Sequence, residues 1–319
     1  MSTMMTISDT AAWLSEHDNY LIFTHRRPDG DTIGCAGALA QGLREAGKTA
    51  FVFNNTETTR RYLRFVAGFL APDDYDPDHV VFVDAASLNL FPKNSDKYTS
   101  AVSLCIDHHP SNTLYAQRTC LDGSFASCGE IIYEILMALS GSISAETAEC
   151  LYAAVSTDTG CFAFSNTTAN TLRVASLLIN AGAPHREINK LLFRTKTRNR
   201  IKLEGALYSG FEYYFEGVVA ISTITRDMIE IANVSEDDMD DIASLPGVVE
   251  GARVGITIRE MSSPDGCKVS VRTSSPLVNA HAVCERFGGG GHPMAAGFTI
   301  DKPVSEVKEA LLRTLREFL

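Results

Sequence analysis

The sequence predicts an α/β protein in which a mostly parallel sheet with helices on both faces is followed by a smaller second α/β domain. Short apolar runs alternate with helical stretches through the first half of the chain, which is typical of an open sheet with helical crossovers. These runs are continuous rather than alternating with polar residues, as in buried parallel strands. The length of 319 residues predicts about two domains.

The strands and helices of the first half follow one another closely. The predicted strands are Tyr20–Thr24, Ala50–Phe53, Val80–Val83 and Val102–Ile106. The predicted helices are Thr32–Ala46, Glu130–Leu139, Ala145–Val155 and Thr171–Ala181. Pro28-Asp29-Gly30 forms a turn before the first of these helices, and Gly182 with Pro184 closes the last.

The second half is more β-like. Its predicted strands are Val218–Thr223, Arg253–Arg259 and Cys267–Arg272, and a final helix is predicted at Val304–Phe318. We expect domains at residues 1–185 and 211–319, joined by a linker at 186–210. The segment from Arg194 to Lys202 has five basic residues and no acid before Glu204. This segment is either a solvated linker helix or a basic surface that faces an anionic substrate.

Charge and cysteine usage limit the class of protein. With 28 Lys+Arg and 39 Asp+Glu, the net charge of −11 argues against a protein that coats long nucleic acid, but not against a short anionic substrate. No stretch has the roughly 18–20 apolar residues that span a bilayer, and the start of the chain lacks a basic signal-peptide region. The eight scattered cysteines form no CxxC pair, which favours reduced thiols in a cytoplasmic protein.

Acidic and histidine residues follow the predicted strands and one helix. They are His25, Asp29 and Asp31 after the first strand, Asp84 after the third, Asp107-His108-His109 after the fourth, and Asp158 after the helix Ala145–Val155. A single such aspartate is commonly a helix cap or a turn former. Because the carboxyl ends of strands in an open sheet converge on one crevice, we expect these groups to meet.

Several carboxylates in one crevice repel one another, and divalent metal resolves that conflict. Asp and His ligands without cysteine favour Mn²⁺ or Mg²⁺ over structural zinc. The set is large enough for two ions that share one carboxylate. Two ions about 3.5–4 Å apart activate water for in-line attack on phosphorus, so phosphate ester hydrolysis is the favoured reaction class.

A glycine run stands near the end of the chain. Gly288, Gly289, Gly290 and Gly291 precede His292, and Arg272 lies upstream at the end of a predicted strand. Such a run is often only a hinge or a tight loop. It can also present successive backbone N–H groups to an anion, beside donors such as His292 and Arg272. The spacing does not match a dinucleotide-binding fingerprint.

Taken together, the ordered motifs H-x3-D-x-D, D, DHH, D and GGGGH resemble those of the DHH/DHHA1 phosphoesterase superfamily, from His25 to Gly297. Within it, the chain most resembles the short two-domain oligoribonuclease (nanoRNase) and phosphoadenosine-phosphate phosphatase group. The resemblance implies a DHH domain that binds metal and a DHHA1 domain that binds substrate. It also implies two Mn²⁺ ions per chain, with Mg²⁺ as the alternative.

The resemblance assigns roles residue by residue. It places one ion at His25, Asp29 and Asp84, and the other at Asp31, Asp84, His108 and Asp158, with Asp84 as the bridge. His109 resembles the histidine that contacts the scissile phosphate, and Asp107 resembles the residue that orients the histidine pair. Arg272, the glycine run and His292 match the substrate-binding elements.

The implied activity is hydrolysis of very short RNA to mononucleotides, of phosphoadenosine phosphate to AMP, or of both. A pApA-type phosphodiesterase, an inorganic pyrophosphatase or polyphosphatase, and a RecJ-like exonuclease on single-stranded DNA are the enzymatic alternatives. A nucleotide-binding regulator with a degenerate site is disfavoured because no ligand position is missing. The expected partner is short RNA or a small phosphorylated nucleotide, not long nucleic acid or a membrane, and a homodimer is left open.

Overall fold

The computed structural model describes residues 2–98, 102–239, 241–261, 266–274 and 278–319. The chain divides into two compact units, an N-terminal unit of Met1–Thr195 and a C-terminal unit of Lys196–Leu319. The predicted linker region therefore falls on both sides of this division.

The N-terminal unit is built on a six-stranded sheet in which every described strand pair is parallel. The strand order is β1-β6-β5-β4-β2-β3. The strands are β1 (Thr3–Met4), β2 (Tyr20–Phe23), β3 (Ala50–Val52), β4 (His79–Val83), β5 (Val102–Asp107) and β6 (Arg118–Leu121). The predicted parallel α/β sheet is confirmed, and β1 and β6 extend it beyond the prediction.

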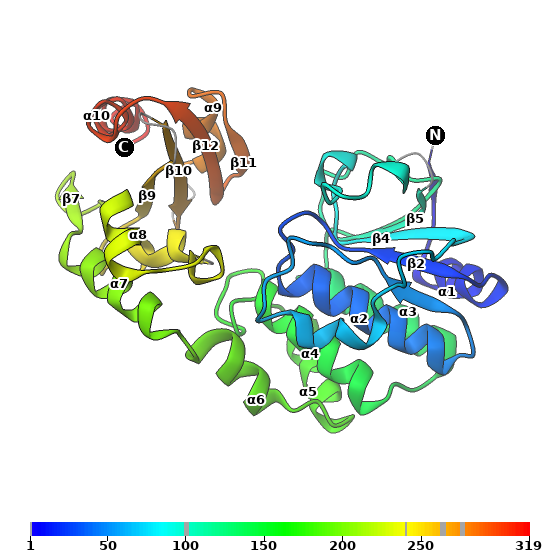
Figure 1. The fold of residues 1–319 in the computed structure, drawn as a ribbon. Coiled ribbons are helices and arrows are strands. Elements are labelled where there is room, and N and C mark those ends of the chain that lie inside the picture. Colours follow the sequence, from blue (N-terminus) through cyan, green and yellow to red (C-terminus); the bar gives the residue numbers. More distant parts are fainter. Residues whose placement is uncertain (1, 99–101, 240, 262–265, 275–277) are drawn as a thin grey trace. The chain divides into compact units, whose positions relative to one another are not determined.

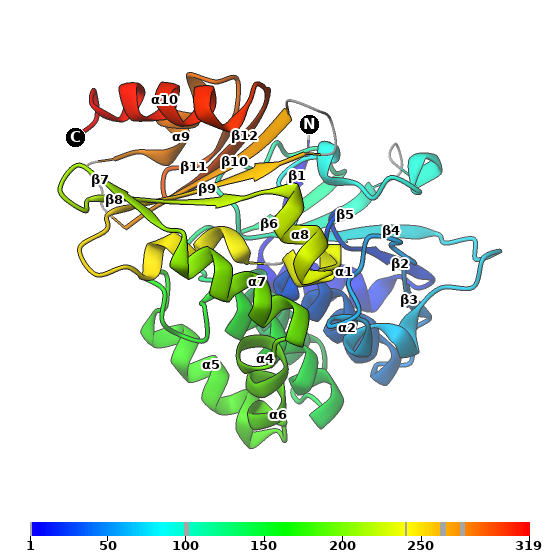
Figure 2. The same ribbon diagram turned by 60° about the vertical axis from the view of Figure 1, so that its left-hand side comes forward.

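The longer α-helices of this unit cover one face of the sheet (Figures 1 and 2). They are α1 (Ile7–Glu16), α2 (Gly30–Glu45), α3 (Cys128–Ser140), α4 (Ala145–Asp158) and α5 (Ala169–Asn180). Their apolar residues form one core with Tyr20, Ile22 and Val81 of the sheet. The other face packs Phe23 and Phe82 against Phe91 and Tyr98, which adjoin or belong to the 3₁₀ helices η3 (Leu88–Leu90) and η4 (Asp96–Tyr98). Helical segments thus lie on both faces.

Glycines allow α2 and α4 to pack closely. A β-carbon at Gly34 would lie 2.4 Å from the carbonyl oxygen of Cys150, and one at Gly30 would lie 2.4 Å from the Thr157 side chain. The start of α2 therefore lies beside the end of α4. This arrangement brings Asp31, in the first turn of α2, near Asp158, the last residue of α4.

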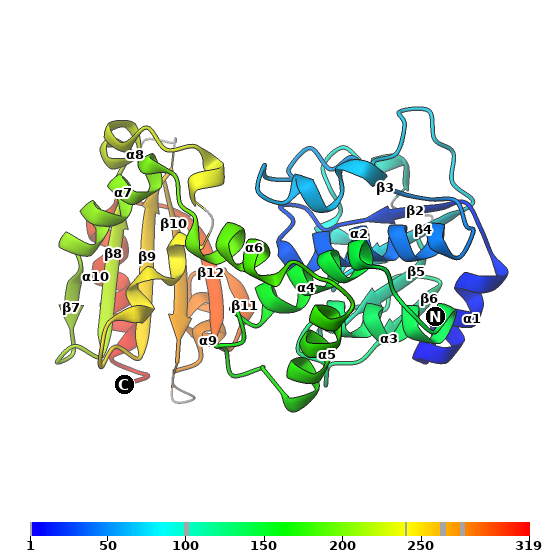
Figure 3. The same ribbon diagram turned by 90° about the horizontal axis from the view of Figure 1, so that it is seen from below.

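The C-terminal unit has a six-stranded mixed sheet in the order β11-β12-β10-β9-β8-β7 (Figure 3). The strands are β7 (Glu212–Tyr214), β8 (Val219–Ile224), β9 (Val254–Glu260), β10 (Gly266–Thr273), β11 (Gly290–His292) and β12 (Ala295–Asp301). Helices α9 (Ala280–Glu285) and α10 (Val304–Leu315) share one core with the sheet. Helices α7 (Arg198–Ser209) and α8 (Arg226–Ala232) belong to another, together with the 3₁₀ helices η6 (Glu236–Met239) and η7 (Ile242–Val248).

The predicted linker is helical through most of its length. It contains α6 (His185–Asn189), the π-helix η5 (Lys190–Arg194) and α7. Part of its basic run is neutralised locally, because Lys196 and Arg200 both form ion pairs with Glu204, at 2.7 and 2.6 Å. Arg198 and Lys202 are exposed.

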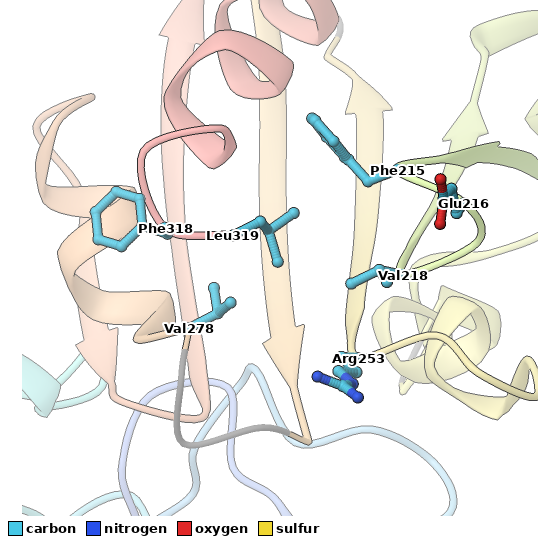
Figure 4. A pocket seen from close by; sticks show the side chains of 7 residues that line it. All are labelled: Phe215, Glu216, Val218, Arg253, Val278, Phe318 and Leu319. Atoms are coloured by element: carbon cyan, nitrogen blue, oxygen red, sulfur yellow. The ribbon is translucent and has the colours of Figure 1, made fainter.

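The C-terminal unit also has a cavity of about 380 Å³ that none of the predicted site residues lines. Its wall is mostly apolar, with Glu216 and Arg253 as the polar residues (Figure 4). The apolar lining residues are Phe215, Val218, Val278, Phe318 and Leu319. Elsewhere, the eight cysteines are all free thiols, as predicted, and seven of them are buried. Among the described helices, none is long and apolar enough to cross a membrane.

Candidate metal centre

The first strand–helix connection positions three of the predicted ligands. His25 lies two residues after the end of β2, and Asp29 is the N-cap of α2. The Asp29 carboxylate accepts hydrogen bonds from the backbone amides of Asp31 and Thr32, at 3.1 and 3.2 Å. The helix begins at Gly30, two residues earlier than predicted, so Asp31 belongs to its first turn rather than to the preceding turn.

Asp84 directly follows β4 and has an unusual backbone. Its φ of 56° is in the left-handed region, which aspartate tolerates better than most residues. Its amide donates to the carbonyl of Ile106 at 2.8 Å, which holds this conformation against the neighbouring strand. The side chain is 3% exposed, and its Oδ1 atom is buried without a hydrogen-bond partner. A buried carboxylate oxygen without a donor is the environment that a cation would satisfy.

The structure brings the six predicted ligands into two groups. One group is His25, Asp29 and Asp84, and the other is Asp31, His108 and Asp158; the ligand atoms within each group lie within 4.8 Å of one another. The Asp84 carboxylate joins the groups. Its Oδ2 lies 3.9 Å from His25 Nε2, and its Oδ1 lies 3.6 Å from His108 Nε2. The arrangement fits two cations that share one carboxylate.

The two histidines of these groups are oriented in the same way. Nδ1 of His25 lies 2.9 Å from the carbonyl oxygen of Arg26, and Nδ1 of His108 lies 3.3 Å from that of Phe125. A proton on Nδ1 would satisfy each carbonyl and leave Nε2 as an acceptor. Metal-binding histidines are commonly held in this way.

His109 has a different environment. Its Nδ1 lies 2.7 Å from Oδ1 of Asp107, and Nδ2 of Asn112 donates to the other oxygen of that carboxylate at 2.6 Å. Nδ1 of His109 also lies 3.5 Å from Asp84, and a third potential metal-binding group is Asp84, His108 and His109. The His109 nitrogen that lies beside Asp84 is the one that Asp107 already engages, so this nitrogen is less available to a metal ion than Nε2 of His25 or His108.

The electrostatics of the cluster favour bound cations. Burial, together with the charges of neighbouring aspartates, raises the pKa of Asp31 and Asp84 well above the usual value and that of Asp158 to about 7. Burial opposes protonation of His25, but Asp29 and Asp84 outweigh it and raise the pKa to about 9. The pKa of His109 is likewise raised to about 9 against the effect of burial, through Asp107 and Asp84. Without metal, the cluster therefore retains protons to reduce its negative charge.

Helix α3 orients Asp31, which the sequence motifs do not reveal. The amides of Cys128 and Gly129 donate to its two carboxylate oxygens at 2.8 and 3.0 Å, and the Cys35 thiol lies 3.3 Å from one of them. A carboxylate at a helix N-terminus is stabilised by such amides. The N-cap Ser127 is the local signal for that helix start, but sequence alone does not reveal which carboxylate meets it.

The predicted substrate residues of the C-terminal unit gather at one end of its sheet. Arg272 of β10 and His292 of β11 both pair with Ala295 of the intervening strand β12. Directly opposed residues point to the same face of a sheet, so Arg272 and His292 share one face with a small residue between them.

The glycine run is not an open loop of amides, which differs from the prediction. Gly290–His292 is a strand, and the amides of Gly288, Gly289 and Gly291 already donate to Glu285, Cys284 and His281. A β-carbon at Gly289 would lie 2.4 Å from the carbonyl oxygen of Gly297. These contacts show that the glycines allow close packing on β12, which leaves the His292 and Arg272 side chains as the better anion donors.

Comparison with known proteins gives the family. The model of the DHH family, N-terminal domain, matches residues 19–155, and that of the DHHA1 domain matches residues 221–319. The bifunctional oligoribonuclease and PAP phosphatase NrnA of Thermus thermophilus is 30% identical over 316 residues, covering 93% of this chain and 89% of that protein. The chain belongs to the DHH family. It is a phosphoesterase of that family with a DHHA1 domain.

Other similar proteins agree with this assignment. The Bacillus subtilis protein of the same name is 29% identical over 295 residues, covering 90% of this chain and 91% of that protein. An exopolyphosphatase-related protein from Bacteroides fragilis has the same fold. Its structure has a TM-score of 0.87 and 22% identity, and the match covers 98% of this chain and 96% of that one.

Proposed function

We propose that this DHH phosphoesterase hydrolyses very short oligoribonucleotides to mononucleotides and phosphoadenosine phosphate to AMP, with two Mn²⁺ ions per chain. The observation that carries the proposal is the pair of ligand groups joined by the carboxylate of Asp84. Relatives of nearly the same length are named as bifunctional oligoribonucleases and PAP phosphatases, which supports the choice of substrates. Mg²⁺ is the alternative metal, since both ions prefer oxygen ligands.

The proposed ligands of one ion are His25, Asp29 and Asp84, and those of the other are Asp31, Asp84, His108 and Asp158. When bound, a pair of divalent ions lowers the pKa of water and neutralises charge on the phosphate. The chain supplies fixed positions for this chemistry. Asp29 and Asp31 are held by the start of α2 and by α3, while hydrogen bonds to backbone carbonyls orient the histidine rings.

His109 is the proposed contact to the scissile phosphate. Asp107 holds its Nδ1 and favours a protonated imidazole, and in the metal-free cluster the pKa of His109 is raised to about 9. A protonated imidazole donates a charge-assisted hydrogen bond to a phosphate oxygen. In the C-terminal unit, Arg272 and His292 are the proposed substrate-binding side chains, as donors to a phosphate or sugar. The net charge of −11 disfavours long nucleic acid.

The proposal is tested with end-labelled RNA of two to ten nucleotides and Mn²⁺. We expect the shortest RNA to be hydrolysed fastest and Asp84→Asn or His108→Ala to abolish the reaction. Asp73→Asn, at an exposed aspartate of the same unit, is the matched control and should retain full activity. Wild-type rates for Asp84→Asn, or equal rates on two and ten nucleotides, would contradict the proposal.

A parallel comparison separates the alternative substrates. Phosphoadenosine phosphate, pApA and inorganic pyrophosphate are offered under the same conditions. Turnover of the first two without turnover of pyrophosphate is the expected result. Preferential turnover of pyrophosphate would favour a pyrophosphatase instead.

A further inference from the structure

The loop that follows Asp158 has a strained backbone. Gly160, Cys161 and Phe162 have φ angles of 55°, 56° and 68°, so three successive residues are left-handed. Glycine accepts this conformation, but cysteine and phenylalanine adopt it at a cost in free energy. Backbone strain of this kind persists only where surrounding contacts hold it, and it concentrates at functional sites.

Hydrogen bonds hold this loop against the candidate metal centre. The Cys161 amide donates to Ser156 at 2.7 Å, and the Phe164 amide donates to Thr159 at 3.0 Å. At the end of the loop, Nδ2 of Asn166 donates to the carbonyls of Asp158 and Ala126, both at 3.1 Å. The loop is therefore fixed to the end of α4 and to the segment that leads into α3.

The fixed loop presents the aromatic ring of Phe164 to solvent. This side chain is 59% exposed, whereas the other exposed large apolar side chains in the described part of the N-terminal unit are not aromatic. The ring lies against Gly160, where a β-carbon would come within 2.4 Å of a ring carbon. Phe164 thus rests on the backbone two residues after Asp158, whose Oδ2 lies 3.6 Å from His108 Nε2.

We propose that Phe164 is a stacking platform for a nucleobase of the substrate. This inference rests on the proposed function, since it assigns the base contact of the same site. Exposed aromatic rings on single-stranded nucleic-acid-binding proteins stack on bases of any sequence, because every base has a π-face. Both short RNA and phosphoadenosine phosphate carry a base, whereas pyrophosphate does not. Phe164 would therefore favour nucleotides over phosphate esters that lack a base.

Binding of two probes in the presence of Mn²⁺ tests this subsite. Calorimetric titration with AMP measures phosphate and base together, and titration with ribose 5-phosphate measures the phosphate without the base. We expect Phe164→Ala and Phe164→Leu to weaken AMP binding by about tenfold and to leave ribose 5-phosphate binding unchanged. Phe164→Trp should retain AMP affinity. Leu172→Ala, at a side chain of α5 that is 54% exposed, is the control and should behave as wild type.

Two results would overturn the inference: AMP affinity unchanged in Phe164→Ala, or equal losses for AMP and ribose 5-phosphate. A kinetic assay on a dinucleotide should agree, with KM raised and kcat retained. Failure of the proposed function is a separate result, since a wild-type chain that binds AMP through Phe164 but hydrolyses no nucleotide would refute only the reaction.

Discussion

At the scale of single residues, Asn112 connects two parts of the candidate metal centre. Its Nδ2 donates to Asp107 at 2.6 Å and lies 3.2 Å from the carbonyl oxygen of Ala85. Tyr115 donates to the same carbonyl at 3.0 Å. Ala85 follows the left-handed Asp84, and Asp107 orients His109. The Asn112 side chain therefore supports the positions of both Asp84 and His109.

We expect Asn112→Ala to lower kcat roughly 10–100-fold, the usual effect of losing a partner that orients a site residue. The change would leave one oxygen of the fully buried Asp107 without its donor and would loosen His109. Steady-state kinetics on a dinucleotide with Mn²⁺ measures the effect, and KM should change little. Asn94→Ala, at an exposed amide of the same unit, is the control. A wild-type kcat for Asn112→Ala would show that the amide does not support His109.

The sequence predicted that the acidic and histidine residues after the strands would meet, because parallel strands bring their carboxyl ends to one edge of the sheet. It could not predict Asn112, the amides of Cys128 and Gly129, or Phe164. These groups act through tertiary contacts between loops, and nothing in their local sequence distinguishes them from ordinary turn and cap residues.

At the scale of elements, the close packing of α2 on α4 sets the separation between Asp31 and Asp158. Gly30 and Gly34 lie on the contact face, with Gly34 against the backbone of Cys150 and Ala154. The helices run in opposite directions, since the start of α2 meets the end of α4. A wider spacing between them would move the two carboxylates apart.

Gly34→Ala tests this role. Alanine raises helix propensity by about 1 kcal/mol, yet its β-carbon would collide with α4, and overpacking typically costs about 1–3 kcal/mol. We therefore expect a lower free energy of unfolding and weaker Mn²⁺ binding. Gly205→Ala in α7 is the matched control, because a β-carbon there has no neighbour within 4 Å, so it should stabilise the protein. Stabilisation by Gly34→Ala, measured by denaturant unfolding, would contradict the account.

Elements with strong apolar patterns were predicted within a few residues, whereas short or weakly patterned ones were not. β6 is only four residues long and begins with an arginine, and β11 is Gly-Gly-His, which has little intrinsic strand preference. Both exist because a neighbouring strand supplies hydrogen-bond partners. Their strand conformation therefore depends on pairing within the sheet, which their own short sequences do not predict.

At the scale of the whole molecule, the aspartates and histidines clustered at the edge of the N-terminal sheet change the pH dependence of folding. The folded protein raises the pKa of Asp158 to about 7 from 3.8, and those of His25 and His109 to about 9 from 6.5. Each group binds its proton more tightly in the folded state. Stability from these groups is therefore lost as pH rises through about 4–7 and then 6.5–9, and His108, whose pKa burial lowers to about 4 from 6.5, offsets only part of this loss.

We expect the EDTA-treated protein to have a lower Tm at pH 8.5 than at pH 5.5. Added Mn²⁺ should raise Tm more at pH 8.5, because metal replaces the protons of the cluster and competes with fewer of them there. Thermal unfolding at both pH values, with and without Mn²⁺, measures this. Greater stability of the EDTA-treated protein at pH 8.5 would show that the cluster does not control the pH dependence.

Asp84 is proposed to join two cation sites, and the number of metal ions that the chain binds is the decisive measurement. Calorimetric titration of the EDTA-treated chain with Mn²⁺ should give two ions per chain for the wild type. Asp84→Asn should weaken both binding steps, because Asp84 is a proposed ligand of both ions and lies beside both His25 and His108. Fewer than two ions per wild-type chain, or two ions bound with unchanged affinity by Asp84→Asn, would contradict the account.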